Sequence, residues 1–226
     1  MKHLPALCAT ASLVCGLALS AATARVCDGP REAREATLGS IKAFIDGKQM
    51  TVVTFAGYSG AEYEDPEAML AQASRILDGL DPAKTLINIG ATEVGIGAVY
   101  DLAKRKGFTT LGIVSSLAHD EQVPLSQCVD YVFYVKDTHW GGKIPGTDRL
   151  SPTSQALVEC SSSFFAIGGG DVARDEMLAA RKLGKPVTFI PADLNHRIAR
   201  EKAQKKGQPE PNDFRGSAHA ALAKEN

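Results

Sequence analysis

The sequence predicts an α/β fold, with a doubly wound, mainly parallel sheet of about six or seven strands and helices on both faces. Short runs of consecutive apolar residues, rich in Val, Ile and Phe, alternate along the chain with amphipathic runs. Strands that are apolar throughout are typical of parallel sheets covered by helices on both sides. The 226 residues are 44% hydrophobic with a formal net charge of −1. This balance excludes a disordered chain and argues against a polycationic nucleic-acid binder.

Residues 1–24 have the pattern of a secretory signal peptide. Lys2 and His3 form a basic start, residues 4–20 are mostly apolar, and residues 22–24 are a small-x-small cleavage site. We expect cleavage after residue 24 and a periplasmic or secreted protein that has no membrane contact once processed. The alternative is a retained N-terminal anchor.

The expected order of elements follows from periodicity and from the helix caps. The predicted strands are residues 51–56, 85–89, 109–114, 131–135, 163–167 and 187–190. The predicted helices are residues 32–47, 66–77, 96–106, 152–159, 171–183 and 194–205. We assign residues 25–207 to one domain and residues 208–226 to a loosely ordered C-terminal tail, because Gly and Pro recur after Gly207.

Three cysteines remain after cleavage, namely Cys27, Cys128 and Cys160. An exported chain meets an oxidising compartment, so an odd count allows one internal disulfide and leaves one thiol. Cys128 and Cys160 each precede a predicted strand by three residues. If those strands are neighbours, the two thiols lie at the same edge of the sheet and can pair.

Glycine clusters follow three predicted strands, at the edge where ligands bind in doubly wound sheets. Glycine lets the backbone approach a ligand, and a following helix N-terminus favours an anion. Tight turns between strands and helices use glycine for structural reasons as well. The candidate ligand-binding residues of these turns are Gly57, Tyr58, Ser59, Gly60, Gly90, Ala91, Thr92, Gly95, Gly97, Gly168, Gly169, Gly170 and Asp171.

These turns resemble the motifs of the SLOG superfamily of Rossmann-like domains, which includes the Lonely Guy (LOG) phosphoribohydrolases, the "lysine decarboxylase"-like proteins and the Smf/DprA proteins. The resemblance runs from about residue 51 to residue 191. It includes a strand that ends in Gly-x-Ser-Gly at residues 57–60, the segment 95–99, and the segment 165–170. The resemblance implies a Rossmann-like fold, a nucleotide-like phosphorylated ligand, a homodimer, and N-glycosidic hydrolase activity as an alternative to binding alone.

The third motif departs from the LOG pattern Pro-Gly-Gly-x-Gly-Thr-x-x-Glu. Asp175 falls at the position of the family's catalytic Glu, and Glu176 is adjacent. Consecutive helical residues point about 100° apart, so we expect one of the two to face the site. Acids in a first helical turn also complement the helix dipole without any catalytic role. The family's Arg-Lys pair has no direct match, and Lys143 and Arg149 are the candidates to replace its positive charge.

Other candidates come from the segments around residues 139–154. His139 and Trp140 lie in a polar loop, where Trp140 either stacks on a ligand ring or packs the loop onto the domain. Thr153 and Ser154 begin a helix and either cap it or donate to a ligand. A lone His196 after the last strand is more typical of a structural role. We expect no metal and no cofactor, since His119 has no second histidine at ligand spacing.

Three functions are therefore carried forward from the sequence. The first is an exported domain that binds a nucleotide or a nucleotide-like phosphorylated ligand, with no nucleic acid as partner. The second is a LOG-like hydrolase that cleaves the N-glycosidic bond of a nucleoside monophosphate, with Asp175 or Glu176 as the acid or base and Arg149 holding the phosphate. The third is a non-catalytic interaction protein that uses its tail and the helix before the first predicted strand.

Overall fold

The computed structural model describes residues 27–223 and contains one seven-stranded sheet in which every pairing is parallel. The strand order is β1-β5-β4-β3-β2-β6-β7. The strands are β1 (Glu32–Ala36), β2 (Thr51–Gly57), β3 (Thr85–Ile89), β4 (Thr109–Ser115), β5 (Tyr131–Val135), β6 (Ser163–Ile167) and β7 (Val187–Ile190). The predicted α/β, Rossmann-like architecture is confirmed.

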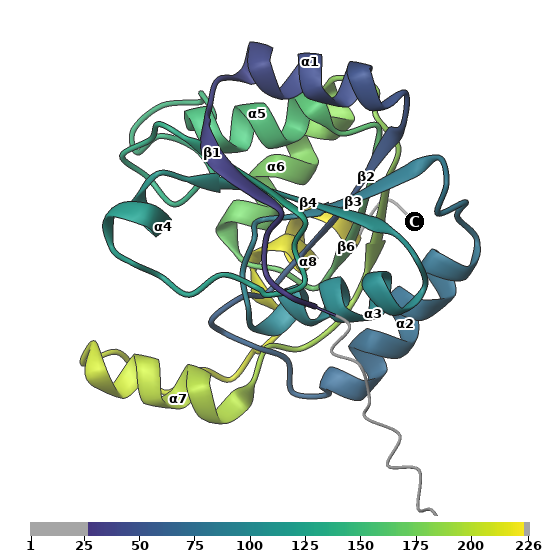
Figure 1. Cartoon of the computed structure of the whole chain (residues 1–226). Coiled ribbons are helices and arrows are strands. Elements are labelled where there is room, and N and C mark those ends of the chain that lie inside the picture. The colour runs from purple at the N-terminus through teal and green to yellow at the C-terminus, as the bar shows by residue number, and fades with distance from the viewer. Residues whose placement is uncertain (1–26, 224–226) are drawn as a thin grey trace, which may run out of the picture.

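Helices cover both faces of this sheet. They are α1 (Leu38–Lys48), α2 (Pro66–Asp78), the 3₁₀ turn η1 (Gly95–Ala98), α3 (Val99–Arg105), α4 (Leu117–Asp120), α5 (Pro152–Cys160), α6 (Asp171–Lys182), α7 (His196–Lys205) and α8 (Gly216–Leu222). Figure 1 shows α1, α5 and α6 on one side of the sheet, α2 and α3 on the other, and α7 standing apart from both layers. Among the described residues, no helix is both long and apolar enough to cross a membrane.

The segment 32–47 is not one helix, as the sequence predicted. Residues Glu32–Ala36 form the edge strand β1, which pairs with β5. The helix begins later because Thr37 caps it, with its side chain accepting a hydrogen bond from the Ser40 backbone. An edge strand with mostly exposed side chains has no apolar run, so the sequence pattern that marks the other strands is missing here.

The sequence predicted a loosely ordered tail from residue 208, and the structure corrects this prediction for residues 208–223. Gly216–Leu222 form α8, whose Ala218 and Leu222 are fully buried in the core shared with α6. The Ala218 backbone donates to the Gly169 carbonyl, and the Tyr58 hydroxyl donates to the Arg215 carbonyl over 2.7 Å. A helix of 7 residues, about two turns, is too short for its periodicity to stand out among the surrounding Gly and Pro.

The disulfide joins Cys27 to Cys128 rather than Cys128 to Cys160. Strand order explains the difference, because β1 and β5 are neighbours whereas β4, β3 and β2 separate β5 from β6. Cys160 is a buried free thiol, and burial raises its pKa to about 11. The predicted signal segment, residues 1–24, lies outside the described residues.

Candidate functional site

A cleft of about 440 Å³ opens at the carboxyl ends of β2, β3 and β4. The chain runs from β2 through β5 in one direction across the sheet and then returns to β6 on the other side of β2. Such a reversal leaves a crevice between the loops that leave neighbouring strands for opposite faces. The cleft is lined by Phe55, Ala56, Gly57, Ser59, Gly60, Ile89, Gly90, Thr92, Val94, Ile96, Ile113, Val114, Ser115, Ala118, Val123, Pro124, Leu125, Trp140, Thr153, Leu157, Val172, Ala173 and Glu176.

The structure gathers part of the sequence-predicted site into this cleft. The predicted residues that line it are Gly57, Ser59, Gly60, Gly90, Thr92, Trp140, Thr153 and Glu176. They come from the ends of two strands and the turns that follow them, from the loop between β5 and α5, from the start of α5 and from the middle of α6. Trp140 is 49% exposed, so its ring is open to solvent at the cleft.

Other predicted glycine-turn residues shape the backbone and do not line the cleft. Tyr58 is buried, and its hydroxyl donates to the Ala192 and Arg215 carbonyls. Gly95 has a φ of +62°, and a Cβ there would collide with the Tyr58 carbonyl. Ala91, Gly97, Gly168, Gly169, Gly170 and Asp171 are likewise absent from the cleft wall. The third glycine cluster instead lies under the C-terminal segment, since the Gly169 carbonyl accepts from Ala218.

Glu176 is the ionisable side chain in the cleft wall, and it is 6% exposed. Its Oε1 accepts a 2.6 Å hydrogen bond from Ser154 Oγ on the neighbouring helix α5. Burial raises the pKa of Glu176 to about 7, assisted by the nearby negative charge of Asp175 and opposed by the bond from Ser154. A carboxyl group in this state can either accept a hydrogen bond or donate one.

Asp175 points to another part of the fold. Its Oδ2 accepts from the Lys143 backbone N–H at 3.0 Å, and its Oδ1 accepts two hydrogen bonds from the Arg174 guanidinium. Asp171, exposed at the start of α6, also pairs with Arg174. Asp175 therefore fastens the loop between β5 and α5 to α6, and Glu176 is the acid of this pair that faces the cleft.

The side chains expected to hold a phosphate lie outside the cleft wall. Lys143 forms an ion pair with Asp148 at 3.0 Å, and Arg149 is exposed on the same loop. His139 is also outside the wall, and its backbone donates to Asp137. Burial acts to raise the pKa of Asp137, but hydrogen bonds from Thr153 and His139 outweigh it and lower the pKa. These bonds tie the loop to the first turn of α5.

Ser154 supports the site from behind the cleft surface. Its Oγ accepts from the Gly142 backbone at 2.7 Å while it donates to Glu176. The helix cap of α5 is a different residue, Ser151, whose side chain accepts from the Ser154 backbone. Ser154 thus orients Glu176 and does not line the cleft itself.

The sequence did not predict the apolar segment of the cleft wall. Val123, Pro124 and Leu125 follow α4 and close one side of the cleft, and Leu125 forms a bridge with Thr92. Ser115 at the end of β4 was also missed, although its place after an apolar strand was a usable signal. The Val-Pro-Leu segment has no such signal, because a short apolar loop carries no periodicity.

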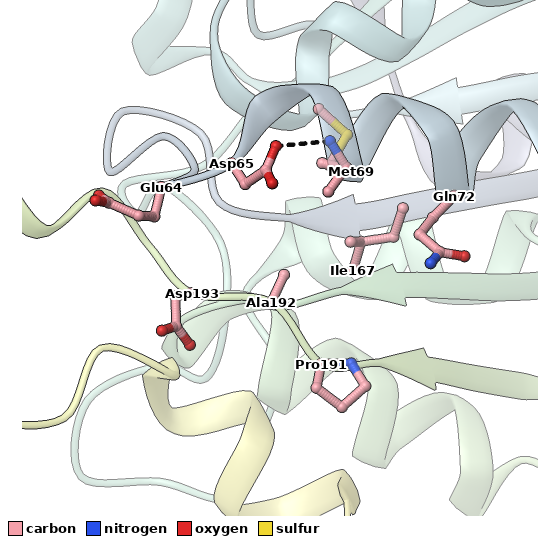
Figure 2. Close-up of a pocket in the computed structure, with 9 residues that line it drawn as sticks. Glu64, Asp65, Met69, Gln72, Ile167, Pro191, Ala192 and Asp193 are labelled. Atoms are coloured by element: carbon pink, nitrogen blue, oxygen red, sulfur yellow. Dashed lines mark hydrogen bonds between the residues drawn. The ribbon is translucent and has the colours of Figure 1, made fainter.

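A second hollow of about 300 Å³ lies beside the start of α2, and Ile167, Pro191 and Ala192 are among the residues that line it (Figure 2). Its polar rim is occupied by contacts within the fold. Asp65 caps α2 by accepting from Ala68, and Glu64 accepts from the His196 backbone at 2.8 Å. The His196 ring stacks on Phe214 at 3.9 Å. These contacts join α2, α7 and the C-terminal segment, which fits the structural role expected for His196.

No protein-family model and no curated protein matches this chain. Solved structures with a similar fold include TM1055, a structural genomics target, at 20% identity and a TM-score of 0.46 over 61% of this chain and 72% of that one. A molybdenum cofactor carrier protein from Chlamydomonas reinhardtii matches at 18% identity and a TM-score of 0.45, over 62% of this chain and 76% of that one. DNA processing protein A from Streptococcus pneumoniae matches at 13% identity and a TM-score of 0.44, over 79% of this chain and 62% of that one. Each of these matches is a likeness in fold at low sequence identity.

Proposed function

We propose that the cleft binds a small nucleotide-related molecule, with a planar ring against Trp140 and hydroxyl or N–H groups toward Glu176. The observation that carries this proposal is the juxtaposition, in one cleft, of a buried carboxyl group, an exposed indole and an apolar wall. Small-molecule sites have this character, namely apolar surroundings with a few placed polar groups.

The position and size of the cleft support the same proposal. It lies at the carboxyl edge of a parallel sheet, beside the point where the strand order reverses. Its volume of about 440 Å³ falls within the range of small-molecule sites. Thr153 and Ser115 add hydroxyl groups to a wall that is otherwise mostly apolar.

The single tryptophan of the sequence gives a direct test. Trp140 lines the cleft, so its fluorescence emission reports on a ligand bound there, and no other tryptophan contributes to the signal. We expect saturable quenching when the protein is titrated with a panel of nucleosides and nucleoside 5′-monophosphates. Calorimetry on the same panel is the second readout, and Trp140→Phe should abolish the optical signal while heat of binding remains. No saturable change in either readout would contradict the proposal.

Cleavage of an N-glycosidic bond is the second candidate function. The specific observation in its favour is Glu176, because a carboxyl group with a pKa of about 7 suits general acid or base catalysis near neutral pH. We expect release of free base, measured by chromatography, to be lost in Glu176→Gln and kept in Lys205→Ala, a substitution on the exposed end of α7. Absence of release from every compound that binds would leave binding alone as the function.

An interaction role has less support. The helix and the tail that it would use are packed into the fold, with Ile41 of α1 and Leu222 of α8 fully buried.

We keep export as a proposal, supported by the signal-like residues 1–24 and by the Cys27–Cys128 disulfide, a bond typical of oxidising compartments. N-terminal sequencing of protein recovered from the periplasm or medium tests it, with Arg25 as the expected first residue.

A further inference from the structure

Among the described residues, no cationic side chain lines the cleft. Glu176 is the ionisable group of its wall, and the remaining lining side chains are apolar or uncharged. A phosphate is a poor fit for such a wall, since an anion is stabilised by nearby cations or by donors that no carboxylate opposes.

The start of α6 is the place where an anion would otherwise bind, because its N-terminal backbone N–H groups and dipole are positive. Val172 and Ala173 of this turn do line the cleft. Asp171, Asp175 and Glu176 surround the same turn, however, and the one cation among them is neutralised. That cation, Arg174, contacts Asp171 at 2.7 Å and Asp175 at 2.9 Å. The carboxylates therefore cancel the attraction of the helix end for an anion.

Two cations of these segments have partners within the fold, and Arg149, exposed on the loop between β5 and α5, does not line the cleft. Lys143 pairs with Asp148, and Lys202 of α7 donates from Nζ to the Gly60 carbonyl at 2.8 Å. Gly60 lies in the cleft wall, so Lys202 contacts that wall through the Gly60 backbone carbonyl. Lys202 itself is not among the lining residues.

We propose that the ligand of this cleft is an unphosphorylated nucleoside, held by Glu176 at a hydroxyl or ring N–H and by the face of Trp140. This inference rests on the proposed function and narrows it from nucleotide-like ligands in general to uncharged ones. Glu176, oriented by Ser154, then selects for hydrogen-bond donors, and the carboxylates at the start of α6 select against phosphate.

The test compares each nucleoside with its own 5′-monophosphate by Trp140 quenching and calorimetry, on the full chain. We expect a nucleoside to bind at least about tenfold more tightly than its monophosphate, the effect of one unfavourable charge contact in a partly desolvated site. Glu176→Gln should weaken the binding of the nucleoside by about tenfold. The variant is nearly isosteric, and its thermal midpoint checks that it is folded.

The affinities of Lys202→Ala for the nucleoside and for its 5′-monophosphate distinguish the two ligand classes. Lys205→Ala, on the same helix, is the control. If the nucleoside is the ligand, neither variant changes its affinity. A monophosphate that binds as tightly as the nucleoside or more tightly would overturn this inference while leaving the proposed function intact. Loss of that binding in Lys202→Ala would then identify the phosphate contact. Binding of neither compound would overturn both proposals.

Discussion

Ser154 and Glu176, on two adjacent helices, share a 2.6 Å hydrogen bond in which the serine hydroxyl donates to the carboxyl group. The same hydroxyl accepts from the Gly142 backbone. One residue along, Asp175 accepts from the Lys143 backbone. Two consecutive acids of α6 thus hold two consecutive residues of one loop, one directly and one through Ser154. The loop that presents Trp140 is fixed by the helix that presents Glu176.

Ser154→Ala should raise the pKa of Glu176 further above its usual range. The serine hydroxyl is the group that opposes burial at this carboxyl, so its loss favours the neutral form. The variant should also lose about 1–3 kcal/mol of stability, because the Gly142 N–H loses its acceptor. Carboxyl carbon chemical shifts followed against pH measure the first effect, and denaturant unfolding measures the second.

Ser217→Ala is the matched control for that variant. Ser217 Oγ makes no hydrogen bond within the described part of the chain, so its removal should leave the titration of Glu176 where it is in the parent protein. A Glu176 titration that is the same in Ser154→Ala as in the parent would mean that the hydrogen bond does not govern this carboxyl group.

Stability should fall as the pH rises from about 4.5 to about 7. Burial raises the pKa of Glu176 to about 7 from a usual value of 4.5, so across this window the folded state keeps a proton that the unfolded state has released. The free energy of unfolding therefore decreases with pH in the window and levels off above it. We expect a change on the order of 1–3 kcal/mol from this group.

Glu176→Gln isolates that contribution, because glutamine cannot titrate. Urea unfolding at several pH values should give a flatter dependence between pH 4.5 and 7 in the variant than in the parent. The neighbouring charge of Asp175 contributes to the raised pKa of Glu176. Asp175→Asn should therefore lower that pKa, and the decrease of stability with pH should end at a lower pH. Parallel curves for the parent and Glu176→Gln would show that Glu176 is not the source of the slope.

The sheet was predictable because six of its seven strands are short apolar runs, and the seventh, β1, was missed because its side chains are mostly exposed. The edge at which the cleft lies was predictable for the same reason, since parallel strands point their carboxyl ends to one side. Which acid faces the cleft was not predictable. Asp175 and Glu176 differ by one step around α6, and only the contact with Lys143 settles that Asp175 turns to the loop.

The disulfide pairing shows a second limit. Cys27 and Cys128 come together because β1 lies next to β5, and β1 is the strand that the sequence pattern does not reveal. The glycine clusters show a third. Gly168 and Gly169 both have positive φ values, but Gly168 packs closely against Tyr58 and Gly169 against Ala218 of α8, a helix that the sequence pattern also left hidden.

Reduction of the Cys27–Cys128 bond should destabilise the protein by about 2–4 kcal/mol, because the bond spans 101 residues and restricts the unfolded chain. Denaturant unfolding with and without reductant measures this difference. The variant in which both cysteines are serine should show the lower stability without reductant and no further response to it. Cys160→Ala should keep the full response, and a parent protein indifferent to reductant would contradict the pairing.

Leu222→Ala should cost about 2–4 kcal/mol, the usual effect of removing a buried leucine side chain. Leu222 is fully buried in the core that α8 shares with α6, so the truncation leaves a cavity. Leu183 just after α6 is the matched control, because it is 58% exposed and its truncation should change stability by less than about 0.5 kcal/mol. Thermal and denaturant unfolding of both variants decide the matter. Equal, small effects would mean that the C-terminal segment does not hold the packed position in solution. A large effect at Leu222 alone would make residues 208–223 part of the domain and would place the third glycine cluster in the core, away from the ligand.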